Sequence, residues 1–325
     1  MYMEGDRIMT ETSRRKAKSW PYQSHQSYEK LLRENSSNWF VDHNYEHDNR
    51  YKFILKNRDD WQQNILVEEV AQYVNNEKEK CKKENKPFPL HRFVHHGLSS
   101  QAMLFNLVGP LIVKNEFGPL KAAFIERNIP WPDGGITPKF EYDNRNLFQE
   151  FQAQPTSIDL VIQSNDLKNT LFIESKLVEH QFGPCSKFTA GDCDGRNPTN
   201  DFSLCYQHFI GRQYWILLEK HGFLKGLMAS SPICPLAMYH QFFREVLFAI
   251  EMGGNFVLIY DERNPTFYCG DSTNRRGLIP FLLNFIPDEI KCHVFSISIQ
   301  QIVKSYEGYP LLSWVIDFKK KYGIL

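Results

Sequence analysis

Two short apolar segments that carry charged residues constrain the fold of this chain more than any other feature. They cover residues 158–162 and 171–174, and turn-forming residues separate them from their neighbours. Short apolar runs bounded in this way are typical of β-strands. The polar stretch 163–170 between them is short enough for an antiparallel hairpin. The sequence therefore predicts two paired strands in this region.

The charged residues of these strands form the strongest chemical signal. Asp159 lies in the first strand, Glu174 ends the second, and Lys176 follows two positions later. Since side chains alternate between the two faces of a strand, Glu174 and Lys176 point to the same side. Hairpin pairing would bring Asp159 near Glu174, and two carboxylates form an oxygen-rich site suited to Mg²⁺. A lysine beside them could orient a water molecule or offset the charge of a phosphate oxygen.

The remaining patterns predict a mixed α/β protein with a helical N-terminal extension. We expect a polar, loosely packed arm over 1–58 and one α/β domain over 59–325. Helices are predicted from Asp59 to about Lys86, from Ser99 or Ser100 onward with an interruption at Gly109–Pro110, over 203–220, over 235–252, and up to Lys319–Lys321. Further strands are predicted at 139–142, 256–260 and 293–299, and a loop over 183–200.

Composition excludes several classes of protein. The chain has 325 residues, of which 42% are apolar, and 38 basic residues balance 38 acidic ones. These values exclude a disordered chain and a collagen-like one. We find neither a run of about 18 apolar residues, as a membrane span requires, nor an apolar signal segment at the N-terminus. We therefore expect a cytoplasmic protein. Its seven scattered cysteines indicate free thiols, or at most a metal site.

The order Asp159, Glu174, Lys176, in the spacing D-x14-E-x-K, resembles the PD-(D/E)XK nuclease superfamily. Further stretches resemble a restriction-endonuclease-like bacterial branch of it, so that the resemblance covers roughly residues 90–260. These stretches are 99–102, 105–107, 109–111, 140–142, 156–159 and 239–244. One position departs from the pattern of the superfamily, since Ile158 rather than proline precedes Asp159.

The resemblance implies a central mixed β-sheet flanked by helices and a metal-dependent DNA endonuclease of restriction or defence type. Asp159, Glu174 and the backbone carbonyl of Ser175 would bind Mg²⁺, with Mn²⁺ as a substitute. Lys176 would position the attacking water, and Gln241 would complete the catalytic set. The residues implied for the DNA substrate are Arg244, Gln101 and Arg92. A further acid often completes such sites, and Glu126, Glu141 and Glu150 are the candidates.

Several alternatives stay open at this point. Glu174 and Lys176 could form an ion pair on a solvated face, and the chain could be a DNA-binding protein that keeps the fold without turnover. Cys185, Cys193, Cys205 and Cys234 could hold a metal or an iron–sulfur cluster. Their wide spacing favours buried free thiols instead. A homodimer is plausible because double-strand cleavage often needs two active sites.

The zero net charge does not exclude DNA, because the charges are unevenly distributed. Residues 141–179 contain seven acids and three bases, as a metal-binding centre would. Basic residues concentrate in 14–18, 78–92 and 319–321, and we expect these segments to attract phosphate groups.

Overall fold

A five-stranded mixed β-sheet forms the centre of the protein in the computed structural model, which describes residues 25–86, 88–151, 155–267, 277–309 and 312–324. The strands lie side by side in chain order, antiparallel from β1 to β3 and parallel from β3 to β5. They are β1 (Ile136–Asp143), β2 (Ser157–Ser164), β3 (Leu171–Lys176), β4 (Asn255–Tyr260) and β5 (Val294–Ser298). All five lie where the sequence predicts strands, and the predicted hairpin is confirmed.

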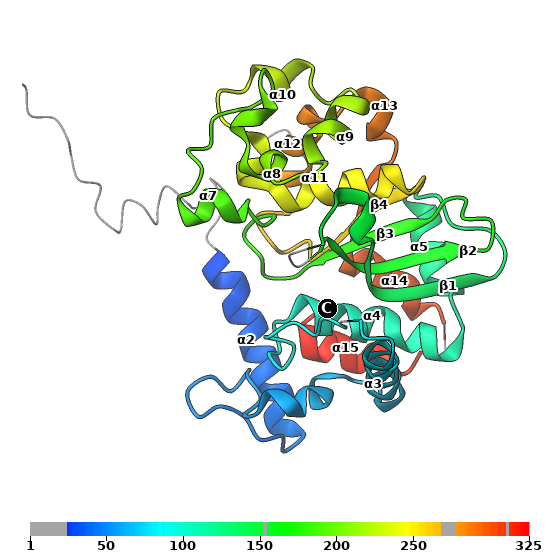
Figure 1. The fold of residues 1–325 in the computed structure, drawn as a ribbon. Coiled ribbons are helices and arrows are strands. Elements are labelled where there is room, and N and C mark those ends of the chain that lie inside the picture. The colour runs from blue at the N-terminus through cyan, green and yellow to red at the C-terminus, as the bar shows by residue number, and fades with distance from the viewer. Residues whose placement is uncertain (1–24, 87, 152–154, 268–276, 310–311, 325) are drawn as a thin grey trace, which may run out of the picture.

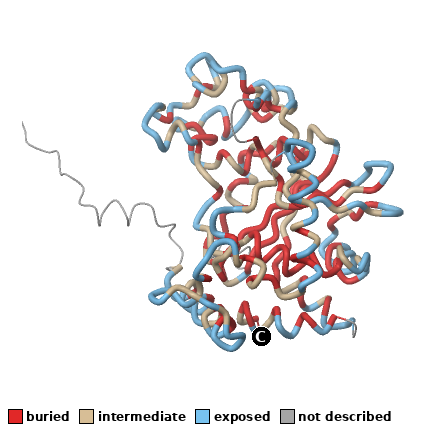
Figure 2. The backbone as a smooth tube through the Cα atoms, turned by 60° about the horizontal axis from the view of Figure 1, so that its bottom comes forward, coloured by how far each residue is buried: buried red, intermediate tan, exposed pale blue. Residues whose placement is uncertain are grey.

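Helices cover both faces of this sheet (Figure 1). On one face lie α3 (Glu68–Lys83), α4 (Ser100–Lys114), α5 (Gly118–Glu126), α14 (Ile299–Glu307) and α15 (Trp314–Tyr322). On the other face lie α9 (Tyr214–Lys220), α11 (Pro235–Glu251), α12 (Leu278–Leu282) and α13 (Asp288–Lys291). Each face therefore has its own apolar core, and the buried residues follow the strands and the helices beside them (Figure 2).

Short elements connect these layers. They are the 3₁₀ turns Arg58–Asn64, Phe202–Leu204 and Leu283–Phe285, and the helices α6 (Arg145–Phe148), α7 (Ser186–Ala190), α8 (Tyr206–Phe209) and α10 (Gly226–Ser230). Two helix predictions and one loop prediction need correction. The helix expected from Asp59 is a 3₁₀ turn followed by α3, and the predicted loop 183–200 contains α7. The helix expected over 203–220 divides into α8 and α9, because Gly211 between them has a φ of +87° that ends a helix.

Helix α4 continues through Gly109–Pro110, where the sequence predicts an interruption. Gly109 lies against α3, and a Cβ atom placed there would be 2.4 Å from Cγ1 of Val70. The glycine therefore allows α3 and α4 to approach closely. Ser99 caps the helix, since its side chain accepts a hydrogen bond from the amide of Ala102 at 3.2 Å, as predicted.

The N-terminal region packs more tightly than the sequence predicts. Residues 1–24 of the expected arm lie outside the described residues, but α2 (His25–Asp42) is a continuous helix that packs against α15. It buries four large side chains, Tyr28, Leu32, Trp39 and Phe40. Local composition misses this packing because the apolar residues of α2 are spaced widely among polar ones.

Candidate active site

A cavity of about 820 Å³ opens where the ends of β2 and β3 meet α4 and α11. The four side chains predicted to be catalytic, Asp159, Glu174, Lys176 and Gln241, all line it. The three predicted to contact the substrate, Arg244, Gln101 and Arg92, line it as well. The tertiary structure thus gathers residues that are spread over 150 positions of the sequence.

The pairing of β2 with β3 sets the position of the two acids. Leu160 pairs with Ile173, so Asp159 and Glu174 follow as the next pair across the hairpin. Ser175 fixes the orientation of Asp159, because its amide and its hydroxyl donate hydrogen bonds of 2.8 and 3.0 Å to Oδ2 of that carboxylate. Metal ligation by the carbonyl of Ser175 stays a prediction.

Glu174, Lys176 and Gln241 form a closed hydrogen-bonded triangle. Nζ of Lys176 donates to Oε1 of Glu174 at 2.5 Å and to Oε1 of Gln241 at 3.0 Å, and Nε2 of Gln241 donates to Oε1 of Glu174 at 2.8 Å. The side chains of Lys176 and Glu174 are only 7% and 3% exposed. The ion pair is therefore buried and does not lie on a solvated face, and a buried pair needs such extra hydrogen bonds to offset its desolvation.

Burial and repulsion between neighbouring acids raise the pKa values of four acids that line this cavity: Glu141, Asp159, Glu174 and Glu245. Burial, with the neighbouring Glu174 charge, raises the pKa of Asp159 to about 8. Burial and the charge of Glu245 raise the pKa of Glu174 to about 8, and the pKa of Glu245 itself rises to about 7, chiefly through burial. Burial alone would lower the pKa of Lys176, but Glu174 and the other acids raise it above its usual value. Lys176 therefore stays positively charged.

Glu245 is a site residue that sequence reasoning missed. It is 1% exposed and lies on α11 one helical turn after Gln241, so both side chains face the cavity. Its Oε2 atom is buried without a hydrogen-bond partner, and so is Oε2 of Glu174. Unpartnered buried carboxylate oxygens are unfavourable in a protein interior. The i, i+4 spacing of Gln241 and Glu245 is the signal that could have revealed it.

Glu141 is the only one of the three acids considered from sequence that lines the cavity in the described part of the chain. It comes from β1, opposite Asp159, since the residues on either side of it pair with Leu160 and Ile158. Gln101 donates to it at 2.5 Å and Ser157 at 3.1 Å. Burial, with the charge of Asp159, raises its pKa to about 8.

The backbone at Glu141 is strained. Its φ of +54° lies in the left-handed region, which is unusual for a residue inside a strand. Such strain persists where surrounding contacts hold it, and here those contacts point the carboxylate into the cavity.

The other two acids lie elsewhere. Glu126 is exposed on α5. Glu150 is buried and does not line the cavity. It accepts hydrogen bonds from the amide of Thr156 at 2.6 Å and from the hydroxyl of Tyr214. Arg244 forms an ion pair with this acid at 3.6 Å, so its charge is already partly neutralised, although it still lines the cavity.

The other two residues predicted for substrate binding have different positions. Gln101 is engaged with protein groups, because it bonds Glu141, the carbonyl of Pro89 and the amide of His91. It therefore orients Glu141. Arg92 is exposed and lies over the ring of Phe93, 4.4 Å from the ring centroid, so it is free to approach a ligand from the rim.

The C-terminal basic segment does not form the phosphate-attracting surface that the sequence predicts. Lys319 pairs with Glu307, and Lys320 pairs with Asp42 at 2.9 Å. Lys321 is fully buried and donates to Oδ1 of Asn64 at 2.7 Å. These lysines hold elements of the fold together, and the expected basic segment 14–18 lies outside the described residues.

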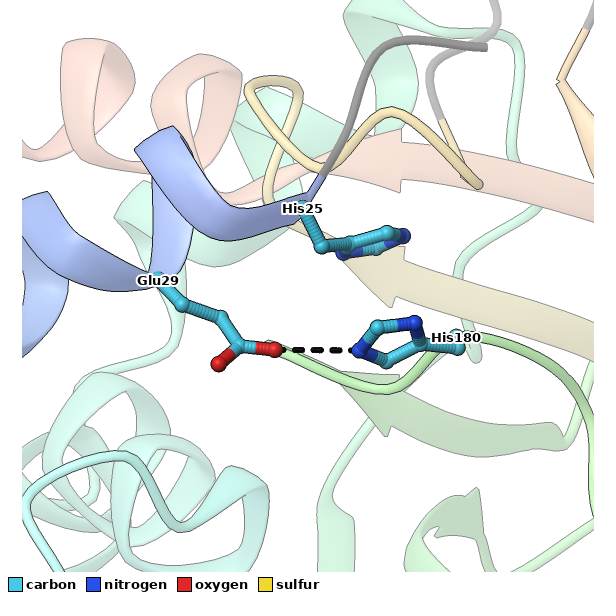
Figure 3. Close-up of side chains that lie close together, drawn as sticks. All are labelled: His25, Glu29 and His180. Atoms are coloured by element: carbon cyan, nitrogen blue, oxygen red, sulfur yellow. Dashed lines mark hydrogen bonds and ion pairs between the residues drawn. The ribbon is translucent and has the colours of Figure 1, made fainter. Parts of the chain in front are cut away.

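A second group of close polar side chains joins α2 to the segment that follows β3. His25, Glu29 and His180 have ligand atoms within 4.8 Å of one another, and the described residues contain no other such group of three (Figure 3). The two imidazole rings stack at 3.9 Å with an angle of 23°, so their nitrogen lone pairs do not converge on one ion. The group is held by hydrogen bonds, of which the one between His180 and Glu29 measures 3.0 Å.

One comparison with known proteins identifies a family for this chain. A family model described as restriction endonuclease associating with ARP matches residues 32–323. Searches of curated proteins and of solved structures return no match. No helix among the described residues is long and apolar enough to cross a membrane. The match extends over nearly the whole chain, and the chain therefore belongs to the family of restriction endonucleases associating with ARP.

Proposed function

We propose that this protein is a Mg²⁺-dependent DNA endonuclease of the PD-(D/E)XK type that acts in restriction or defence. The family supports a nuclease role, and the site supports the chemistry. The observation that carries the proposal is the convergence of Asp159, Glu174 and Lys176 in one cavity, where buried carboxylate oxygens lack partners.

The acids of the cavity are the ligand type that a divalent cation prefers, and binding would draw their oxygens together, because no three of these acids have oxygens within 4.8 Å of one another. Oxygen ligands are those that Mg²⁺ and Mn²⁺ prefer. Oε2 of Glu174 and Oε2 of Glu245 are buried without hydrogen bonds, and a cation would satisfy both oxygens. Asp159 would provide the ligand from the neighbouring strand. When bound, the cation would offset the repulsion among these acids and the charge that develops on the phosphate in phosphodiester hydrolysis.

The other residues of the site would position the reactants. Lys176 keeps its proton, so its ammonium group would orient the attacking water and attract the phosphate. Gln241 would hold Lys176 against Glu174, because it contacts both side chains. Glu141 would complete the acidic wall of the cavity opposite Asp159, held there by Gln101. Arg92 at the rim would contact the DNA backbone.

Plasmid cleavage in the presence of Mg²⁺ or Mn²⁺ tests the proposal. Lys176→Met and Asp159→Asn are expected to lower the cleavage rate by at least about 100-fold, as loss of a positioned catalytic group does. Matched controls lie in the turn at the far end of the same hairpin, where Lys168 and Asp166 are exposed. Lys168→Met and Asp166→Asn should cleave like the unmodified protein.

The same assay distinguishes the rival reading as a DNA-binding protein without turnover. That reading predicts a gel shift with DNA but no cleavage by any of the five proteins. Equal cleavage by the Lys176 and Lys168 variants would also refute the site.

A further inference from the structure

Four cysteines that are far apart in the sequence line one small pocket together with His240. They are Cys185, Cys193, Cys205 and Cys234. Cys185 precedes α7, Cys193 follows it, Cys205 precedes α8 and Cys234 precedes α11. None of the four forms a disulfide. Their intervals in the sequence favour scattered free thiols, whereas the fold brings all four together.

The segment that these cysteines hold has little apolar core of its own. Neither α7, α8 nor the 3₁₀ turn Phe202–Leu204 contains a buried residue. Large apolar side chains are exposed there, with Leu204 62% and Phe209 78% accessible. Segments that bury so little apolar surface usually depend on a disulfide or a metal for stability. Since these thiols form no disulfide, a metal bound in this pocket would be the cross-link that stabilises the segment.

We propose that Cys185, Cys193, Cys205 and Cys234 bind a metal centre through four thiolates, either a zinc ion or an iron–sulfur cluster. Four thiolates are a ligand set that selects these two centres. Cys185 and Cys234 are buried, at 8% and 7% exposure, so the centre would be shielded from solvent on one side. None of these four cysteines lines the cavity that contains Asp159 and Glu174.

The spacing of the sulfurs favours the cluster over a single ion. With Zn–S bonds of 2.3 Å, a tetrahedral zinc site places its sulfurs about 3.8 Å apart. No three of these sulfurs lie within 4.8 Å of one another, since the one such ligand group among the described residues is that of His25. An iron–sulfur cluster keeps its cysteines farther apart, because the inorganic core lies between them.

The metal centre would also stabilise the start of α11. Cys234 is the residue before that helix and donates its amide hydrogen to the carbonyl of Gly195 at 2.8 Å. The amide of Cys185 donates to the carbonyl of Ala237 at 3.0 Å, within the first turn. Because α11 carries Gln241 and Glu245, the centre would act on the catalytic cavity as a positioning element.

Metal analysis of the full-length protein, purified without oxygen, tests the proposal. We expect one centre per chain, either about one zinc or about four irons with matching acid-labile sulfide. The visible absorption spectrum separates the two, because only the cluster is coloured. The variants Cys193→Ser and Cys205→Ser change half-buried residues, and each should lose at least half of the metal.

Cys81→Ser and Cys292→Ser are the controls, since both cysteines lie outside the pocket and should leave the metal content unchanged. Circular dichroism reports whether each variant folds. The proposal is overturned if the unmodified protein contains no stoichiometric zinc or iron, including after reconstitution with iron and sulfide. It is equally overturned if folded Cys193→Ser and Cys205→Ser proteins keep their full metal content.

Discussion

Replacing Glu245 by glutamine should stabilise the metal-free protein while it impairs DNA cleavage. Glu245 is buried, and its Oε2 atom has no hydrogen-bond partner. Burial raises its pKa from 4.5 to about 7. A buried carboxylate without a full set of hydrogen bonds lowers the stability of the fold, so a purely structural role would not explain it. If the glutamine variant is more stable but less active, the charge of Glu245 is needed to bind a ligand.

The shift in pKa sets the size of the effect. A rise from 4.5 to about 7 corresponds to about 3 kcal/mol, at 1.36 kcal/mol for each pH unit. For an acid with a raised pKa, the stabilisation is complete below the unfolded value and is lost as the pH rises through the folded value. The variant should therefore match the unmodified protein at pH 4 to 5. At pH 8 it should gain roughly 2 to 3 kcal/mol, which for a chain of 325 residues corresponds to a Tm about 3 to 4 °C higher.

Thermal unfolding in EDTA, followed at pH 5 and pH 8 and repeated with saturating Mg²⁺, measures this effect. Mg²⁺ should raise the Tm of the unmodified protein more than that of the variant, because the variant lacks one ligand. Glu219→Gln, on the exposed side of α9, is the control and should have no effect. A variant that is destabilised equally at both pH values, or that responds to Mg²⁺ like the unmodified protein, would refute the reasoning.

Three further predictions concern stability and metal binding. Glu141, Asp159, Glu174 and Glu245 have pKa values of about 7 to 8. The unfolding free energy of the metal-free protein should therefore fall from pH 5 to pH 8, and Mg²⁺ should bind more tightly as the pH rises over the same range. Calorimetry at several pH values checks both. Gly254→Ala should lower the unfolding free energy by about 1 to 3 kcal/mol in urea titrations, because its Cβ atom would lie 2.4 Å from the carbonyl oxygen of Thr170. The control Gly135→Ala should have little effect, because its Cβ atom would meet no atom within 4 Å. Phe248→Ala should lower the unfolding free energy by about 3 to 5 kcal/mol, because that ring is fully buried. Phe209→Ala changes an exposed side chain, and its unfolding free energy should stay within about 0.5 kcal/mol of that of the unmodified protein. A similar loss for both variants would contradict the assignment of the core.

The strands and the grouping of Asp159, Glu174 and Lys176 could be predicted because their signals are local. Alternation along β3 puts Glu174 and Lys176 on one face whatever the rest of the chain does. The short turn after β2 leaves the hairpin as the simplest pairing, and that pairing places Asp159 beside Glu174. The helices were less predictable, since a glycine can end one helix at Gly211 and permit close packing in another at Gly109.

The sequence by itself determined the class of the fold, the strands and the three residues Asp159, Glu174 and Lys176. Only the tertiary structure decided that Glu141 and Glu245 join them, that Lys321 is buried, and that four cysteines meet in one pocket. The physical reason is that strand alternation and helical periodicity act over a few residues. Contacts among β1, β2 and α11, or among the loops around α7 and α8, depend on how whole elements pack. The spacing of the contacting residues along the sequence does not predict that packing.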